Sequence, residues 1–211
     1  GSEMCIRDSP KLRGTMGRKR NTTNSIAGTY EISTGELVVE PDPFRDGAFI
    51  LNVNGVPSSH LIPDEPRTLE FEYMRWIAAA VENLAPGKRL LHLGGGGCSL
   101  PRYFANLWPD SHNTVVELDA KLAELIRELA GIPSAPRVKI RAGEARAVTE
   151  GFPPNRFDVI IRDVFAGAIT PEPLTTEEFF QHAHATLSPG GLYVANCGDH
   201  SDLQGAKAEL A

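Results

Sequence analysis

Four groups of residues that could bind or transform a small molecule each follow a short apolar stretch. They are Gly94–Gly97, Glu117, Glu144 and Asp163. In a parallel sheet with helices on both faces, ligands bind in the crevice at the carboxyl ends of the strands, where the strand order reverses. If the apolar stretches are strands of one such sheet, the four groups meet at one edge and surround a single ligand.

The glycine run and Glu117 are typical of a nucleotide site. Glycine has no Cβ, so Gly94, Gly95 and Gly96 allow a tight turn and close approach of a ligand to the backbone. The run does not match the G-x-G-x-x-G dinucleotide fingerprint, since no glycine stands at the fingerprint's last position. Glu117 stands where a carboxylate can accept hydrogen bonds from two ribose hydroxyls. A simple strand-to-helix turn and a surface carboxylate are the alternatives.

The other two acidic positions favour different chemistry. A carboxylate at Glu144 can accept a hydrogen bond from the exocyclic amine of adenine, and a solvated loop glutamate is the alternative. Asp163 stands where a carboxylate can hold or deprotonate an amine nucleophile. Loop capping or a salt bridge with Arg162 is the alternative for that aspartate. Asp119 is predicted to cap the helix that follows it.

Histidine and cysteine offer weaker candidates. His60 could act as a base near the site, and an exposed loop histidine is the alternative. His182 and His184 are two residues apart on a predicted helix and do not share a face, so we expect no metal site there. The three cysteines form neither a disulfide framework nor a zinc pattern. A helix N-terminus could lower the pKa of Cys98, but a packing role is the favoured interpretation.

An alternation of apolar strands and amphipathic helices positions these groups. Five strands are predicted, at Arg89–Leu93, Thr114–Leu118, Arg137–Arg141, Phe157–Ile161 and Leu192–Asn196. Helices are predicted between them, including one that starts with a capping box at residues 175–178 and ends near Leu187, before a turn at residues 188–191. A further helix is predicted at Asp202–Leu210. The alternation predicts an α/β fold with a doubly wound parallel sheet and right-handed crossovers.

A small β region is predicted ahead of this sheet. Short strands are expected at Thr29–Ile32, Leu37–Glu40 and Ala48–Val53, followed by an Asn54-Gly55 hairpin signal. A helix then follows whose apolar face is predicted from its periodicity to contain Leu69, Tyr73, Trp76, Ile77, Ala80, Val81 and Leu84. We therefore divide the chain into a terminal segment (1–25), a β-hairpin region (26–66) and a nucleotide-binding domain (67–211).

Composition narrows the function classes. Hydrophobic residues make up 41% and charged residues 23% of the chain, which is typical of a globular protein. Residues 1–25 have no hydrophobic periodicity and resemble, in part, translated sequencing-adapter sequence, so we expect them to be disordered and foreign to the fold. The net charge is −6, although the first 20 residues carry six basic and only two acidic residues. We expect no nucleic-acid partner, no membrane span and a cytoplasmic location.

The order of these motifs resembles the spermidine synthase (aminopropyltransferase) family, in particular an actinobacterial-type divergent subgroup. The similarity runs from about Ala48 to the end of the chain. Six motifs carry it: Leu51–Val56 resembles "vLDGv", Glu70–Tyr73 resembles "DEFxY", Gly94–Gly97 resembles "GGGDGG", Val116–Asp119 resembles "xEID", Gly143-Glu144 resembles "GD", and Arg162-Asp163 resembles "xDSSDP". The resemblance implies a class I methyltransferase-like Rossmann domain behind a small antiparallel β region.

The resemblance also implies an activity and the roles of site residues. The reaction moves an aminopropyl group from decarboxylated S-adenosylmethionine to a small-molecule amine in polyamine biosynthesis, and no permanently bound cofactor is expected. Asp163 would orient and deprotonate the amine. The other implied roles are donor contact for Gly94, Gly95 and Gly96, ribose binding for Glu117, adenine contact for Leu118 and Glu144, and acceptor contact for Tyr73 and His60. Family members commonly form homodimers.

Departures from the family pattern leave three functions open. Gly97, Ala166 and Met74 replace polar family residues that help to hold the donor's ammonium group or the acceptor. The alternatives to aminopropyl transfer are a methyltransferase that uses S-adenosylmethionine and a catalytically silent binding module. Five strands instead of the usual seven also indicate a C-terminally truncated domain. We expect the fifth strand to be an unpaired edge and the protein to be poorly soluble.

Overall fold

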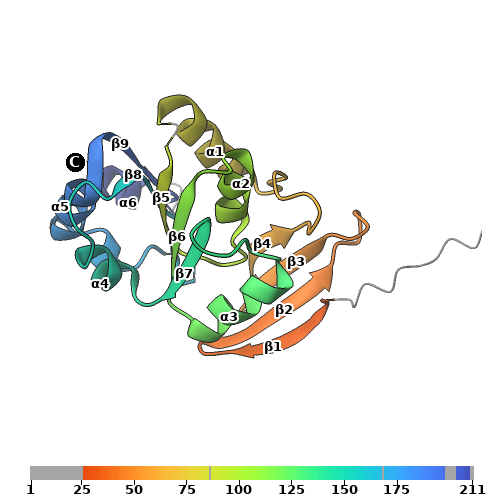
Figure 1. Cartoon of the computed structure of the whole chain (residues 1–211). Coiled ribbons are helices and arrows are strands. Elements are labelled where there is room, and N and C mark those ends of the chain that lie inside the picture. The colour runs from red at the N-terminus through yellow and green to blue at the C-terminus, as the bar shows by residue number, and fades with distance from the viewer. Residues whose placement is uncertain (1–25, 86, 168, 198–202, 210–211) are drawn as a thin grey trace, which may run out of the picture.

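The structure, a computed structural model, describes residues 26–85, 87–167, 169–197 and 203–209. The terminal segment at 1–25 therefore lies outside the described residues. Two sheets form the molecule: a four-stranded antiparallel sheet of order β1-β2-β3-β4 and a five-stranded sheet of order β7-β6-β5-β8-β9 (Figure 1).

The antiparallel sheet contains β1 (Gly28–Ile32), β2 (Gly35–Pro41), β3 (Phe49–Val53) and β4 (Val56–Leu61). The three predicted strands are confirmed. The fourth follows the predicted Asn54-Gly55 turn, in which both residues have positive φ (51° and 77°), as a tight two-residue hairpin requires. The sequence did not indicate the fourth strand because Pro57, Ser58 and Ser59 interrupt any β-branched pattern.

The five-stranded sheet confirms the predicted parallel architecture. Its strands are β5 (Arg89–Leu93), β6 (His112–Glu117), β7 (Val138–Ala142), β8 (Phe157–Arg162) and β9 (Leu187–Ala195). Every neighbouring pair is parallel. The chain runs outward from β5 to β7 and then returns to the other side of β5 with β8. The switch point, where a ligand is expected, therefore lies between β5 and β8.

The fifth strand differs from its prediction at one end. The predicted turn at residues 188–191 lies inside β9, which begins at Leu187 rather than Leu192. Its pairing with β8 changes register between Phe157 and Val159, and Gly190 has a φ of 76°, so the glycines produce a bulge instead of ending the strand. Within the described residues β9 is an edge strand, as predicted. The poor solubility expected from that edge stays a prediction.

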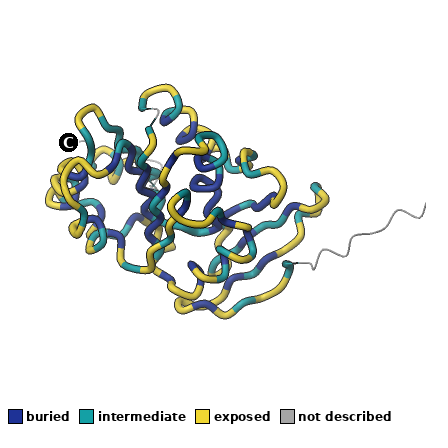
Figure 2. The backbone as a smooth tube through the Cα atoms, in the orientation of Figure 1, coloured by how far each residue is buried: buried dark blue, intermediate teal, exposed yellow. Residues whose placement is uncertain are grey.

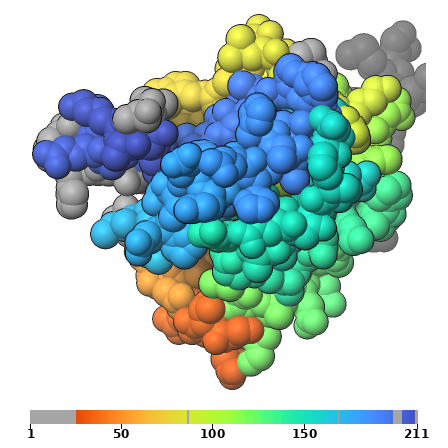
Figure 3. Space-filling model, turned by 90° about the vertical axis from the view of Figure 1, so that its left-hand side faces the viewer, coloured from red at the N-terminus to blue at the C-terminus, as the bar shows by residue number. Residues whose placement is uncertain are grey.

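Helices pack on both faces of the parallel sheet. They are α1 (Glu72–Leu84), α2 (Ser99–Leu107), α3 (Ala120–Leu129), α4 (Ala145–Glu150), α5 (Glu177–Thr186), α6 (Gln204–Glu209) and the 3-10 turn η1 (Glu172–Leu174). One core cluster joins α1 and α2 to the sheet, a second joins α4 and α5 to it, and a third joins α3 to the antiparallel sheet. In Figure 3 the blue C-terminal elements lie beside the teal-green segment that carries α4.

Two helix starts were predicted and two short elements were not. Asp119 caps α3, as expected, by accepting a hydrogen bond from the Leu122 N–H. The N-cap of α5 is Thr176, whose hydroxyl accepts from the Phe179 N–H, so the predicted capping box is displaced by one residue. The predicted final helix falls partly outside the described residues, and α6 is its described part. Neither α4 nor η1 was predicted, because each is shorter than two helical turns.

The buried face of α1 corrects the sequence prediction. Trp76 and Leu84, both expected in the core, are 65% and 70% exposed, and the buried side chains include Met74 and Ala78 instead. The predicted apolar stripe was too broad for one helix face, and packing on the sheet selects only part of it (Figure 2). None of the helices in the described part of the chain is both long enough and apolar enough to cross a membrane.

Candidate functional site

A cavity of about 660 Å³ lies at the carboxyl ends of the parallel strands. All the predicted site residues except His60 line this cavity, and they come from five separate segments of the chain. These residues are Tyr73, Gly94, Gly95, Gly96, Glu117, Leu118, Glu144 and Asp163. The topology thus brings together side chains that are up to 90 residues apart in the sequence.

The loop after β5 needs glycine at two positions for steric reasons. Gly94 has a φ of 92°, and a Cβ there would overlap the carbonyl oxygen of Asp163. A Cβ on Gly95 would lie 2.9 Å from the Oε2 atom of Glu117. The tips of β5, β6 and β8 therefore approach one another so closely that only a bare backbone fits between them.

Glu117 holds the glycine loop in place. Its Oε2 atom accepts hydrogen bonds from the N–H groups of Gly95 (2.9 Å) and Gly96 (3.1 Å). Its Oε1 atom accepts from the Asp119 N–H at 3.0 Å. The carboxylate is therefore fixed at the rim of the cavity, and its Oε1 atom can still accept another hydrogen bond from a ligand.

Asp119 connects this edge to the antiparallel sheet. Besides capping α3, it accepts hydrogen bonds from the N–H groups of Ser33 (3.0 Å) and Thr34 (2.6 Å) in the turn between β1 and β2. Burial raises the pKa of Asp119, but the hydrogen bonds from Leu122, Ser33 and Thr34 outweigh burial and lower the pKa to about 2. Asp119 is thus a structural carboxylate that stays ionised at neutral pH.

The end of the glycine loop is covered by β4. Gly97 donates its N–H to Ser59 Oγ at 2.8 Å, and a Cβ on Gly97 would overlap the Ser59 side chain. Gly97 itself does not line the cavity. Cys98 is fully buried, and burial raises the pKa of its thiol to about 12. The thiol is therefore not activated by the helix N-terminus, and the packing role is confirmed.

Asp163 is the most distinctive group in the cavity. Its Oδ2 atom accepts from the Tyr73 hydroxyl at 3.1 Å, and its Oδ1 atom accepts from Asn196 Nδ2 at 3.0 Å. Both donors are neutral. No cation forms an ion pair with Asp163 in the part of the chain that the structure describes. Burial raises the pKa of Asp163, and the two hydrogen bonds only partly oppose that effect.

The predicted salt-bridge alternative for Asp163 is wrong. Arg162 is fully buried, donates to the Leu174 carbonyl at 2.7 Å and forms an ion pair with Glu209 at 2.6 Å. Successive residues of a strand point to opposite faces, so Arg162 and Asp163 diverge. Asn196 was not predicted as a site residue. It follows β9, and its N–H bonds the Arg162 carbonyl, which places its side chain beside Asp163.

Glu144 and Leu118 lie at the rim near β6 and β7. Both carboxylate oxygens of Glu144 accept hydrogen bonds, each at 2.8 Å, from the N–H groups of Arg146 and Ala147 at the start of α4. The side chain therefore caps a helix, and its contact with adenine stays a prediction. Leu118 is 65% exposed while it lines the cavity, which leaves its apolar side chain accessible to a ligand.

His60 is a correction to the predicted site. Its ring is buried in the antiparallel sheet, its Nε2 atom lies 2.7 Å from Asp42 Oδ2, and the residue does not line the cavity. Both interpretations of His60, as a base near the acceptor and as an exposed loop histidine, are therefore wrong. Among the described residues, no group of three or more His, Cys, Asp or Glu side chains is arranged to hold a metal ion.

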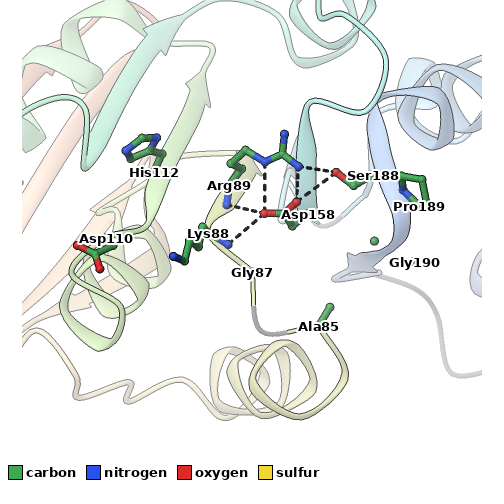
Figure 4. Close-up of a pocket in the computed structure, with 11 residues that line it drawn as sticks. Ala85, Gly87, Lys88, Arg89, Asp110, His112, Asp158, Ser188, Pro189 and Gly190 are labelled. Carbon is green, nitrogen blue, oxygen red and sulfur yellow. Dashed lines mark hydrogen bonds and ion pairs between the residues drawn. The ribbon is translucent and has the colours of Figure 1, made fainter.

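A second hollow of about 580 Å³ lies at the opposite, amino-terminal end of the strands (Figure 4). Arg89 forms an ion pair with Asp158 at 2.5 Å and also donates to Ser188 Oγ at 2.6 Å. The other Asp158 oxygen accepts from the N–H groups of Lys88 and Arg89. Arg89 and Asp158 thus satisfy each other and join the starts of β5 and β8 to β9.

Comparison with known proteins gives a consistent result. A family model described as "Spermine/spermidine synthase domain" matches residues 70–204. A polyamine aminopropyltransferase from Vibrio vulnificus is 30% identical over 141 residues, which are 66% of this chain and 47% of that protein. The crystal structure of a probable spermidine synthase from Corynebacterium glutamicum is 58% identical with a TM-score of 0.84, and the match covers 89% of this chain and 69% of that one.

A more distant structure supports the fold alone. Human methyltransferase-like protein 13, solved in complex with SAH, is 24% identical with a TM-score of 0.56, over 66% of this chain and 70% of that one. This likeness confirms the predicted class I methyltransferase-like fold. The chain spans about half the length of the Vibrio relative (47%).

Proposed function

Because this chain belongs to the spermine/spermidine synthase domain family, we propose that it transfers an aminopropyl group from decarboxylated S-adenosylmethionine to an amine, in polyamine biosynthesis. The observation that supports this most directly is Asp163, a partly buried carboxylate with two neutral hydrogen-bond donors and no cationic partner in the described structure. It lines the same cavity as the glycine loop and Glu117. An amine acceptor supplies the missing positive charge.

The glycine loop and its neighbours fit the adenosyl part of the donor. Glu117 is fixed by three backbone N–H groups and accepts a ribose hydroxyl with the lone pair that remains on Oε1. Leu118 offers an exposed apolar surface for the adenine ring. Glu144 accepts from the exocyclic amine of adenine while it caps α4. Gly94, Gly95 and Gly96 leave room for the donor to lie against the backbone.

Asp163 handles the proton of the acceptor. The amine nitrogen attacks the carbon next to the sulfonium; a C–N bond forms, the C–S bond breaks, and its electron pair neutralises the sulfur as methylthioadenosine leaves. The proton that the nitrogen loses passes to Asp163 and then to solvent. Burial raises the pKa of this carboxyl group, which makes it a better base than an exposed aspartate. Tyr73 and Asn196 fix the direction of its oxygens.

A direct assay tests the proposal. The protein is incubated with decarboxylated S-adenosylmethionine and a panel of primary amines, and methylthioadenosine is measured by chromatography. We expect product with at least one amine and its loss in Asp163→Asn. Absence of product with every amine, from protein that melts cooperatively, would contradict the proposal. Turnover that depends on Asp163 would also exclude a catalytically silent binding module.

One observation favours a methyltransferase as the second candidate. Ser59 occupies the space next to Gly97, so this loop has no room for a carboxylate, which would hold the ammonium of the decarboxylated donor and repel the carboxylate of S-adenosylmethionine. S-adenosylmethionine as the donor would transfer a methyl group instead. Calorimetry with both donors separates the candidates. Tighter binding of the decarboxylated donor supports aminopropyl transfer, and tighter binding of S-adenosylmethionine supports methyl transfer.

A further inference from the structure

His92 is a buried histidine in the wall of the cavity. It lies in β5 two residues before the glycine loop, lines the cavity and is 2% exposed. Its Nε2 atom lies 3.0 Å from Asn113 Oδ1, while its Nδ1 atom is buried and has no hydrogen-bond partner among the described residues. A buried polar atom without a partner is unfavourable. In a residue that lines a ligand cavity, such an atom points to a partner supplied by the ligand.

The hydrogen bonds of Asn113 decide which ring nitrogen of His92 carries the proton. The Asn113 amide donates from Nδ2 to Ser111 Oγ at 3.0 Å and to the Arg137 carbonyl at 3.2 Å. Its other atom, Oδ1, can only accept, so His92 Nε2 is the donor of the bond between them. Burial lowers the pKa of His92 to about 4, so the ring is neutral at pH 7. Nδ1 therefore carries a lone pair and accepts a hydrogen bond.

Asn113 also fixes the direction of the ring. It pairs with Leu90, two residues before His92, on the β6 side of β5. The two nitrogens of an imidazole ring point in diverging directions, so Nδ1 is directed away from β6, toward β8 and the carboxyl end of the sheet. The residue that pairs with His92 in β8 is Ile161, which also lines the cavity.

Asp163 lies on the same face of the sheet as His92. It follows Ile161, the partner of His92, by two residues. Because alternate residues of a strand share a face and each residue advances the strand by about 3.3 Å, Asp163 lies roughly 7 Å nearer the carboxyl end than His92. The side chains of Met74, Leu100 and Ile161 line the cavity on this face and are 5%, 4% and 1% exposed. Two polar groups are thus separated, along an apolar wall, by about the length of a short aliphatic chain.

We propose that His92 is the second anchor of an acceptor that is an aliphatic amine with a nitrogen at each end. One nitrogen binds Asp163, and an N–H of the other is donated to His92 Nδ1, while the carbon chain lies against the apolar wall. An ammonium donor makes this bond charge-assisted, and the neutral ring does not repel it. The proposal rests on the proposed function and makes His92 a residue that selects a diamine over a monoamine of equal length.

Amines of equal length test the proposal. The kcat/KM for methylthioadenosine release is measured with 1,4-diaminobutane and with butylamine, in the wild type and in His92→Phe, which keeps a flat ring without its nitrogens. We expect the diamine-to-monoamine ratio to fall at least about tenfold in His92→Phe, which corresponds to about 1.4 kcal/mol. His60→Phe is the matched control, because His60 Nδ1 is also buried without a partner in the described structure but His60 does not line the cavity. The same ratio in the wild type and His92→Phe would overturn the proposal and leave the proposed function intact.

Nitrogen NMR of the wild type gives a readout that needs neither turnover nor a variant. The histidines are labelled with nitrogen-15, and methylthioadenosine is present throughout. We expect His92 Nδ1 to give the signal of an unprotonated ring nitrogen, which moves upfield when 1,4-diaminobutane is added, as a nitrogen that accepts a hydrogen bond does, and stays in place with butylamine. A His92 signal that does not respond to the diamine would contradict the proposal. A response without product from any amine would support this contact and contradict the proposed function.

Discussion

The two ends of the parallel sheet carry hollows of similar size, about 580 Å³ at the amino end and 660 Å³ at the carboxyl end, but their charges are arranged differently. At the amino end, Arg89 and Asp158 neutralise each other and Ser188 completes the network. At the carboxyl end, Asp163 has only the neutral donors Tyr73 and Asn196. Volume alone therefore does not identify the site; an uncompensated charge beside a bare backbone loop does.

Backbone N–H groups bind a carboxylate at both ends, but among the described residues only the carboxylate at the amino end, Asp158, also has a cationic partner. At the carboxyl end, the glycine loop leaves the N–H groups of Gly95 and Gly96 facing a carboxylate that a ligand can share. At the amino end, the N–H groups of Lys88 and Arg89 are used by Asp158. We infer that the amino end holds strands together and that the carboxyl end is kept for a ligand.

The largest effect is expected from removal of the charge at Asp163, and Asp158 provides the matched control. Asp163→Asn should lower kcat/KM for methylthioadenosine release by about 100-fold or more, the usual contribution of a general base. Asp158→Asn should leave it within about threefold, because its carboxylate contacts only the protein. The assay uses one donor and one amine for both variants. Similar losses in the two variants would remove the distinction between the ends.

Glycine substitutions should separate binding from stability. A Cβ on Gly97 overlaps Ser59, and a Cβ on Gly191 would lie 3.0 Å from the Asp158 carbonyl oxygen. Each change to alanine should lower the free energy of unfolding by about 1–3 kcal/mol through overpacking. Only Gly97→Ala should also weaken binding of methylthioadenosine, since that strain reaches the glycine loop. Denaturant titration measures the loss of stability, and calorimetry measures the binding of methylthioadenosine. Weaker binding in Gly191→Ala would argue against the difference between the two ends of the sheet.

The stabilising role of Asp158 should depend on pH. Burial raises its pKa, but the hydrogen bonds and charge of Arg89 outweigh burial, so the folded-state pKa lies below the usual 3.8. Its contribution is therefore complete above the unfolded-state pKa and is lost as the pH falls through the lowered value. Asp158→Asn should cost about 1–3 kcal/mol at pH 7. Urea titrations should show this difference shrinking below about pH 4; a gap that widens in acid would contradict it.

The smallest effect is expected at the exposed rim. Leu118 and Trp76 are both 65% exposed, but only Leu118 lines the cavity. Leu118→Ala should weaken binding of methylthioadenosine by roughly fivefold, about 1 kcal/mol, because it removes apolar contact area. Trp76→Ala should leave that affinity unchanged. Calorimetry measures both, and an equal change in the two variants would place the adenine elsewhere.

Sequence reasoning predicted the acidic residues at the strand ends well. Apolar runs show where strands end, and a parallel sheet brings the carboxyl ends of its strands to one edge. Glu117 and Asp163 were found in this way. Asn196 was missed, since its contact with Asp163 depends on β9 lying next to β8 in space. His60 was misplaced because its partner, Asp42, is 18 residues away across the antiparallel sheet.

Burial was the other quantity that the sequence did not provide. Sequence position left a lowered thiol pKa for Cys98 as the alternative to the favoured packing role, and full burial, which raises that pKa to about 12, decides for packing. Periodicity placed Trp76 in the core, although packing on the sheet leaves it mostly exposed. In both cases tertiary packing, which is not encoded in local pattern, decides the outcome.

Binding of methylthioadenosine, measured by calorimetry, tests the central claim most directly. The claim is that an adenosyl group binds at the carboxyl end of the sheet, against the glycine loop and Glu117. We expect the wild type and Asp158→Asn to bind with similar affinity and Glu117→Ala to bind at least about tenfold more weakly, about 1.4 kcal/mol. Unchanged affinity in Glu117→Ala, with a loss in Asp158→Asn, would place the ligand at the other end and contradict the account.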